Sequence, residues 1–192
     1  MRRSLLLAPL FATPTQAEDA FHSVAQPAFQ DAGPAYQGVV PLQQGDLWGL
    51  MGPDGQWIAP PQFAQVGVPG QGRFPVKTGD KWGVVDLQGQ IVVSFQMDNI
   101  GVIDTLTPMQ SGGLWYAVGL DNVPQAQPLP FDTLVGNEGA CFVGTSDGIA
   151  VSSWRGDTPL DQIMPDFESM GAPKGGYVPV QMGGKASLMD CA

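Results

Sequence analysis

Short apolar runs separated by glycine-containing turns recur along most of the chain. Residues 74–78 and 81–86 form two extended runs around a turn at 79–80, and a second turn at 88–89 leads into the apolar run 91–94. β-Branched and aromatic runs of this length between such turns are typical of strands joined as hairpins. We therefore predict a three-stranded β-meander here, because a helix of a dozen residues does not fit between the turns.

The alternation within residues 81–86 assigns side chains to the two faces of the predicted strand. With a period of two, Trp82 and Val84 lie on one face, and Gly83 and Val85 lie on the other. Gly83 then leaves bare backbone that a large side chain of a neighbouring unit can cover. We expect the units to stack on one another in this way, and we interpret the tryptophan as a core aromatic rather than a ligand-stacking residue.

The unit occurs twice without a gap and several more times in weaker form. Residues 45–50 superpose on residues 79–84 at an offset of 34. Helical tetratricopeptide arrays share this period, so the strand pattern within the unit decides the fold. Each front half carries a proline followed by an apolar residue, and the tryptophan position comes a few residues later. The prolines are Pro41, Pro75, Pro108 and Pro179, with Phe142 in the same place, and the tryptophan position holds Trp48, Trp82, Trp115, Ile149 and Ala186.

The back half of the unit has its own signature. It ends with an aromatic residue or methionine, two further residues, an apolar residue and usually a glycine. The aromatic or methionine positions are Phe29, Phe63, Met97, Phe131 and Phe167.

These half-units predict how the array ends. Residues 24–29 superpose on residues 58–63, so the chain opens with a back half, and residues 176–190 form a front half. The two halves add up to one unit, and four complete units lie between them. Because an open stack exposes an apolar face at each end, we predict an all-β, closed, propeller-like ring of five meanders of about 34 residues. In this ring the N-terminal segment pairs with the C-terminal strands, and an open β-solenoid is the alternative.

Two strings carry a resemblance to a known family. GDLWGLMGPDGQWIAPPQF and GDKWGVVDLQGQIVVSFQM resemble the WG repeat, whose pattern is a Trp-Gly pair, a turn and a β-rich stretch ending in an aromatic residue. Trp48-Gly49 and Trp82-Gly83 match that pair, whereas Trp115-Tyr116 loses the glycine. The resemblance implies a non-catalytic bacterial β-repeat module with an interaction or scaffolding role, and no catalytic residue comes with it.

The composition narrows the choice of partners. Of 192 residues, 43% are hydrophobic, which is too apolar for a disordered chain. The formal net charge is −10 and the isoelectric point is near 4.1, opposite to what a phosphate-binding surface needs. We therefore expect no nucleic-acid partner.

The first residues predict export. Arg2-Arg3, the apolar run 5–11 and the small residues Thr15 and Ala17 form the pattern of a signal peptide, so we expect cleavage after Ala17. The apolar run is too short to span a membrane. The prediction is a signal peptide over residues 1–17 and one β domain over 18–192, in the periplasm or outside the cell.

Export bears on the two cysteines. In an oxidising compartment, two thiols in one chain are commonly paired. Cys141 and Cys191 form either a disulfide or two buried free thiols, because sequence does not report their distance.

Few residues suggest catalysis. The chain has one histidine, His22, and no second histidine or CxxC pair for zinc, so we expect no cofactor or metal. The densest acidic group, which consists of Asp157, Asp161, Asp166 and Glu168, fits a solvated loop better than a calcium loop.

Three functions stay open at this stage. The first is an envelope or extracellular module that binds a protein or ligand, marked by a contiguous apolar or aromatic patch on one face. The second is an envelope hydrolase with two carboxyl groups about 5 to 10 Å apart in a cleft, one of them with a raised pKa. A purely structural envelope protein cannot be separated from the first by sequence.

Overall fold

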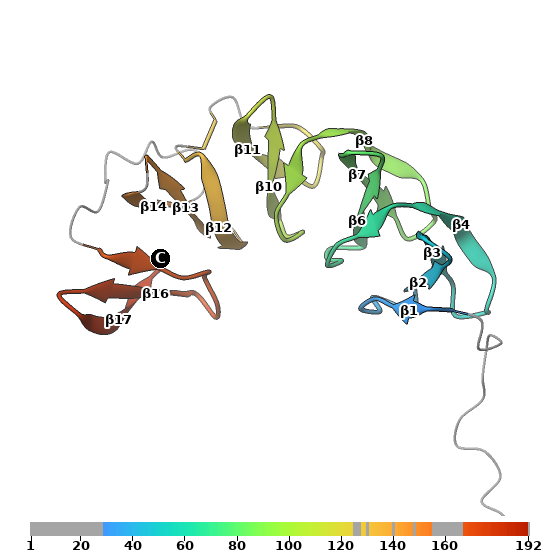
Figure 1. The fold of residues 1–192 in the computed structure, drawn as a ribbon, viewed down its shortest axis with the longest axis horizontal. Helices are drawn as coiled ribbons and strands as arrows, with labels where there is room; N and C mark the ends of the chain where they lie inside the picture. Colours follow the sequence, from blue (N-terminus) through green and yellow to red (C-terminus); the bar gives the residue numbers. More distant parts are fainter. Residues whose placement is uncertain are drawn as a thin grey trace, which may run out of the picture.

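The chain folds as a series of antiparallel β-sheets. The computed structural model describes residues 29–124, 128–129, 131–139, 141–147, 149–154 and 167–191, and the regular secondary structure in these ranges consists of strands. Five sheets follow one another in chain order along an open arc (Figure 1). The predicted signal peptide, His22 and the acidic residues 157, 161 and 166 lie outside the described residues.

Within each sheet the strands pair in sequence order as a meander. The first sheet contains β1 (Asp31–Ala32), β2 (Val40–Gln44), β3 (Leu47–Met51) and β4 (Trp57–Phe63); the second contains β5 (Gln65–Val66), β6 (Arg73–Thr78), β7 (Lys81–Asp86) and β8 (Ile91–Met97). The third contains β9 (Asn99–Ile100), β10 (Leu106–Ser111) and β11 (Leu114–Gly119); the fourth contains β12 (Thr133–Glu138), β13 (Cys141–Ser146) and β14 (Ile149–Trp154). The fifth contains β15 (Ser169–Met170), β16 (Tyr177–Met182) and β17 (Lys185–Asp190).

The all-β prediction is confirmed, with one difference in the number of strands. The runs expected at 74–78, 81–86 and 91–94 are the strands β6, β7 and β8. The first two sheets have four strands rather than three, because a two-residue strand, β1 or β5, pairs with the outer edge of the second strand. In the second sheet this short strand begins two residues after Phe63, so the back half of one unit begins the sheet of the next.

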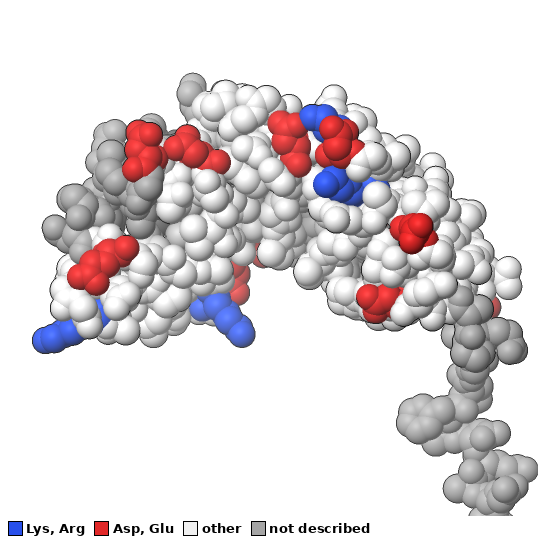
Figure 2. Space-filling view, in the orientation of Figure 1, with Lys and Arg blue, Asp and Glu red and all other residues white. Residues whose placement is uncertain are grey.

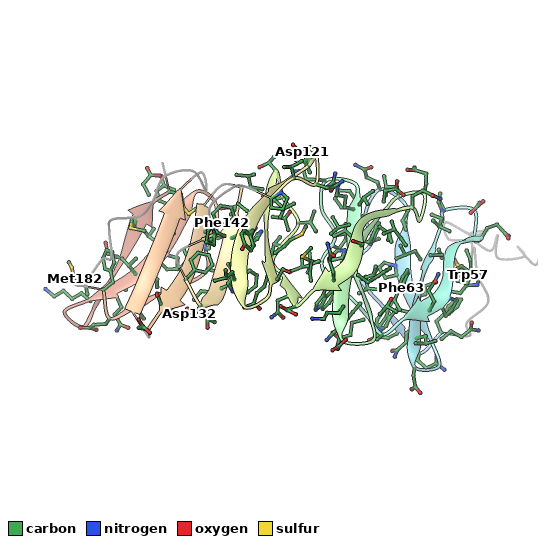
Figure 3. All side chains as sticks on the ribbon, turned by 90° about the horizontal axis from the view of Figure 1, so that it is seen from above. Trp57, Phe63, Asp121, Asp132, Phe142 and Met182 are labelled. Carbon is green, nitrogen blue, oxygen red and sulfur yellow. A yellow bond between two sulfur atoms is a disulfide. The ribbon has the colours of Figure 1, made fainter. Side chains whose placement is uncertain are left out.

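Buried side chains join each sheet to its neighbour. Val84 and Val85, adjacent in β7, belong to different clusters, which shows that both faces of the second sheet are packed. Leu50 of the first sheet packs with Phe74 and Val76 of the second, and all three are fully buried. In Figure 3, side chains fill the space between the sheets, among them those of Phe63 and Phe142. The four clusters join the first sheet to the second, the second to the third, the third to the fourth and the fourth to the fifth.

The glycines beside Trp48 and Trp82 are covered differently from the prediction. A Cβ on Gly83 would lie 2.8 Å from the ring of Phe95 in β8, and a Cβ on Gly49 would lie 2.7 Å from the ring of Trp57 in β4. The covering side chain therefore comes from the next strand of the same sheet and not from a neighbouring unit. The reason is that the third and fourth strands pair directly, with register shifts that bring these rings over the glycines.

The described residues form an arc and not a ring. The first and fifth sheets lie at the two tips of the arc, apart from each other (Figure 1). Tyr177, which a closed ring would cover, is about half exposed. Residues 24–28, the segment expected to close the ring, lie outside the described residues.

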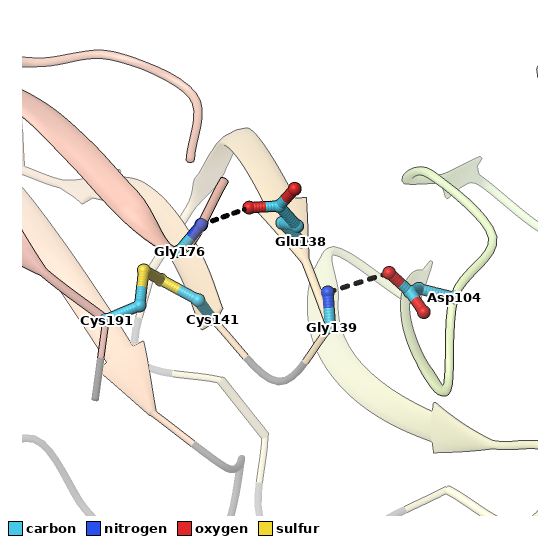
Figure 4. The surroundings of a disulfide bond; sticks show 6 residues. All are labelled: Asp104, Glu138, Gly139, Cys141, Gly176 and Cys191. Atoms are coloured by element: carbon cyan, nitrogen blue, oxygen red, sulfur yellow. Dashed lines mark hydrogen bonds between the residues drawn. A yellow bond between two sulfur atoms is a disulfide. The ribbon is translucent and has the colours of Figure 1, made fainter. Parts of the chain in front are cut away.

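A disulfide joins the last two sheets. Cys141, at the start of β13, is bonded to Cys191, which follows β17, with 5.8 Å between the Cα atoms (Figure 4). Both cysteines are buried in the cluster between the fourth and fifth sheets. The structure therefore contains the Cys141–Cys191 disulfide and not two free thiols.

We predict that replacing both cysteines by serine destabilises the end of the array selectively. The bond closes a loop with a sequence separation of 50, for which chain entropy gives about 4 kcal/mol. Hydrogen exchange should accelerate in β13, β16 and β17 and stay unchanged in β2 and β3. Uniform acceleration across all five sheets would contradict this local role.

Candidate functional site on the concave side of the arc

A glycine follows the short first strand in most sheets and contacts a proline of the second strand. Its N–H donates a hydrogen bond to the proline carbonyl. The donor–acceptor distances are 2.9 Å for Gly33 to Pro41, 2.8 Å for Gly67 to Pro75, 2.8 Å for Gly101 to Pro108 and 2.8 Å for Gly171 to Pro179.

At three of these glycines, Gly67, Gly101 and Gly171, the contact leaves no room for a Cβ atom, whereas a Cβ on Gly33 would lie 3.1 Å from Pro41. A Cβ on Gly67 would lie 2.8 Å from Cγ of Pro75, and a Cβ on Gly101 would lie 2.5 Å from Cγ of Pro108. The glycine and the proline of this contact both recur at regular positions in the sequence, but the glycine follows the first strand and the proline lies in the second. Only the structure shows that they meet.

Two of these glycines, Gly67 and Gly101, are each followed by an exposed valine. Val68 follows Gly67 and is 58% exposed, and Val102 follows Gly101 and is 46% exposed. Val135, which precedes Gly136 in the fourth sheet, is 39% exposed. These three valines, which we call the valine row, come from three consecutive sheets.

The valine row borders a pocket of about 250 Å³. Its walls come from the second, third and fourth sheets, and they include Trp82, Ile100 and Leu134 beside the glycine backbone. In Figure 1, β1 and β12 lie toward the concave side of the arc, whereas β4, β8 and β14 lie toward the convex side. Because the row lies at the first strands, it belongs to the concave side.

The tryptophans differ in burial. Trp115 is buried, and its indole Nε1–H donates to the carbonyl oxygen of Asp132 at 3.1 Å. Trp48 and Trp82 are half-buried, and Lys77 Nζ lies 5.7 Å from the centroid of the Trp82 ring. Trp82 therefore presents part of its ring to the pocket, whereas Trp48 packs against the first core cluster.

The repeated aromatic or methionine residues belong to the back half of each unit. Phe63 and Phe131 are buried, and Phe29, Met97 and Phe167 are half-buried. A polar residue directly after this position often accepts a hydrogen bond from the N–H of a hairpin turn about fifteen residues later. The pairs are Gln30 with Gly45, Asp132 with Asp147 and Glu168 with Gly184. Sequence analysis missed these caps, although their spacing of 15 or 16 residues was there to find.

A buried amide holds the wall of the pocket. The side chain of Asn137 accepts from the N–H of Val102 and donates to its carbonyl oxygen, both at 2.9 Å. Because both polar ends are satisfied, this amide fixes the third sheet against the fourth. It also sets the position of Val102 in the valine row.

Two carboxylates near the disulfide bind backbone N–H groups (Figure 4). Asp104 accepts from Gly139 at 2.8 Å, and Glu138 accepts from Gly176 at 2.9 Å. Hydrogen bonds from Gly176 and Gly175 lower the pKa of Glu138. These carboxylates therefore connect loops of adjacent sheets, and the shift of Glu138 is opposite in direction to that of a general acid.

The described residues offer neither a metal site nor a membrane-spanning helix. No three histidine, cysteine, aspartate or glutamate side chains lie close enough together there to hold a metal ion. No helix in this part of the chain has the length and hydropathy needed to cross a membrane.

Shared cores join the successive sheets, and the valine row lies on the concave side of the second, third and fourth sheets. The family model of the WG containing repeat matches residues 48–82 and 82–105. Residues 48–105 are therefore WG repeats, which confirms the resemblance where the Trp-Gly pairs occur.

The chain was also compared with curated proteins and with solved structures. No curated protein matches the sequence. Solved structures that resemble the chain include Kluyveromyces lactis Hsv2 (TM-score 0.49, 8% identity, 81% of this chain and 57% of that one). They also include Citrobacter koseri AztD (TM-score 0.44, 17% identity, 83% and 55%) and the N-terminal domain of Nup159 (TM-score 0.40, 10% identity, 85% and 61%). The chain thus spans little more than half the length of these proteins.

We predict that Gly67→Ala lowers the free energy of unfolding by about 1 to 3 kcal/mol, because its methyl group overlaps the Pro75 ring. Adding Pro75→Ala should recover part of the loss, since the double variant removes the overlap. Denaturant midpoints of the four proteins in this cycle measure the coupling. Additive losses in the double variant would contradict the contact.

Proposed function

We propose that this protein is an exported, non-catalytic module that binds an extended segment of a partner protein on the concave side of its arc. The observation that carries the proposal is the valine row, which exposes one apolar side chain from each of three consecutive sheets beside a pocket. A contiguous apolar patch with a pocket is typical of an interaction surface.

The chemistry of the pocket favours an extended peptide over a polar ligand. Its walls are valine, leucine, isoleucine, proline and the Trp82 ring, and the amide of Asn137 is already occupied by Val102. Apolar anchors at regular spacing fit alternate side chains of an extended chain. The partner segment would therefore be rich in aliphatic residues.

Two kinds of contact that recur along the chain support an array of five units in all, of which two match the family model. The hydrogen bond from glycine to proline occurs in the first, second, third and fifth sheets. The polar cap on the hairpin turn occurs in the first, fourth and fifth sheets. Together these contacts give every sheet at least one feature of the same unit.

Export and the lack of catalysis rest on separate observations. The Cys141–Cys191 bond is typical of an oxidising compartment, which agrees with the signal-peptide pattern over residues 1–17. The alternative, a carboxylate-dependent hydrolase, would use the Asp104 and Glu138 pair, whose oxygens accept hydrogen bonds from the backbone. We therefore place binding ahead of hydrolysis.

The binding proposal predicts that charge on the valine row abolishes capture of the partner. The protein would be immobilised and exposed to envelope extract, and the captured proteins would be compared by mass spectrometry. Val68→Asp with Val102→Asp should reduce the captured partner at least about tenfold, since each buried carboxylate costs several kcal/mol.

Ile91→Asp provides the matched control, because Ile91 is as exposed as Val68 but lies on β8, on the convex side. Circular dichroism establishes that all variants are folded. If the double variant retained the same partner, the binding surface would lie elsewhere.

The export proposal predicts that material recovered from the periplasm or medium begins at Glu18. Intact-mass measurement tests this directly. A soluble, exported form that retains residues 1–17 would contradict the signal-peptide hypothesis.

A further inference from the structure

A second cavity opens between the second and third sheets, apart from the valine row. Its volume is about 320 Å³, and it shares no lining residue with the pocket beside the valine row. One wall is β8, which lies toward the convex side of the arc (Figure 1). The apolar walls consist of Met97 of β8, Met109 of β10, Tyr116 and Val118 of β11, and Pro124. The cavity is therefore a site distinct from the concave surface.

The junction between the first and second sheets shows what fills this space one unit earlier. There, the ring of Phe95 in β8 lies over Gly83, on which a Cβ would be 2.8 Å from the ring. The same ring packs on Phe63, with 6.4 Å between the two ring centroids. Met97 has the position of Phe63 one unit later, and Tyr116 has the position of Gly83. At the earlier junction, an aromatic ring therefore occupies the space that corresponds to the cavity.

The third unit does not supply the corresponding ring. Leu129 has the position of Phe95, since each lies two residues before the repeated aromatic or methionine position. Leu129 is buried in the cluster between the third and fourth sheets, on the opposite face of the third sheet. Tyr116 stands where Gly83 stands, so its Cβ takes room that a ring placed like Phe95 needs. Among the described residues, no side chain replaces Phe95 at this junction, and the cavity is left beside Tyr116.

A turn residue keeps the third sheet from closing over the cavity. In the turn after β7, Gly89 packs on Ile58 of β4 so closely that a Cβ on it would lie 3.0 Å from the Ile58 carbonyl oxygen. Asn122 has the same position in the turn after β11, and it lines a continuation of the cavity. Its side chain is held by Arg73, whose Nη1 donates to Oδ1 at 2.8 Å. With a side chain at this position, the turn cannot approach the neighbouring sheet as Gly89 does.

The lining of the cavity favours an uncharged aromatic ligand. None of the residues that line the cavity or its continuation is charged, although acidic and basic side chains are spread over the surface of the arc (Figure 2). Met97 and Met109 supply polarisable sulfur atoms, which make favourable contacts with aromatic rings. Gln96 and Ser111 are exposed at the mouth and carry groups that form hydrogen bonds. Because a cavity of about 150 Å³ holds benzene, this one has room for a ring with a polar substituent.

We propose that this cavity binds a small, uncharged aromatic molecule. The ring takes the place that Phe95 has at the preceding junction, in contact with Met97 and Tyr116. A hydroxyl or amide substituent of the ligand reaches Gln96 or Ser111 at the mouth. Since the cavity and the valine row share no lining residue, this site does not depend on a partner segment on the concave side.

Titration of the methionine-methyl-labelled chain with phenol, followed by NMR, tests the site. The methyl signals of Met97 and Met109 should shift, because an aromatic ring shifts the signals of nuclei packed against it, and that of Met170 in β15 should not. The dissociation constant should be roughly 0.1 to 10 mM for a ligand of this size. Cyclohexanol, which lacks the aromatic face, should bind at least about fivefold more weakly, and benzoate, which is charged, should not bind. Equal shifts at all three methionines, or equal affinity for cyclohexanol, would overturn the proposal.

Filling the cavity should abolish the binding. Met97→Trp places an indole in the cavity and should raise the dissociation constant for phenol at least about tenfold, read from the Met109 methyl signal. Met170→Trp makes the same change at another half-buried methionine and should leave the affinity unchanged.

A second variant covers the case in which Met97→Trp does not fold by circular dichroism. Gln96→Ala with Ser111→Ala changes only exposed residues, and it should weaken phenol binding about threefold or more through lost hydrogen bonds. Unchanged phenol affinity in either folded variant would overturn the site.

Discussion

Burial of one sheet against the next is the interaction on which this architecture depends. A three- or four-stranded meander has two faces, and a single sheet leaves both in water. Here Leu50, Val84 and Ala117 are fully buried only because another sheet follows each of them. Every cluster joins two consecutive sheets, so stability is close to a sum over neighbouring pairs.

The strands and turns of the second sheet could be predicted from the sequence. For the fourth sheet, the sequence did not predict which residues of its strands face which neighbouring sheet. Alternation placed Val84 and Val85 on opposite faces correctly, because β6 and β7 pair without interruption. In the fourth unit, Phe142 was aligned with Pro108, yet Val143 is the residue that faces the following sheet. The pairing of β12 shifts between Leu134 and Gly136, and a shift of one residue exchanges the two faces of a strand.

The concave surface was beyond sequence reasoning for a different reason. The repeated glycines and prolines were visible as positions, but their contact joins strands and depends on the backbone approach at Gly67 and Gly101. Exposure of the valine row gave no signal either, because a hydropathy pattern does not distinguish an exposed valine from a buried one. Asn137 gave no signal at all, because its two hydrogen bonds go to the backbone of Val102 in another sheet.

The position of the disulfide has a mechanical consequence. When the two ends of the chain are pulled apart, the load passes from Cys141 to Cys191 through the sulfur atoms. The segment between them, which contains most of β13 and all of β14 to β17, carries none of that tension and cannot be extended. Sheets near the N-terminal tip, and β12 of the fourth sheet, would unravel strand by strand, whereas the strands β13 to β17 would stay looped together at any force that spares a covalent bond.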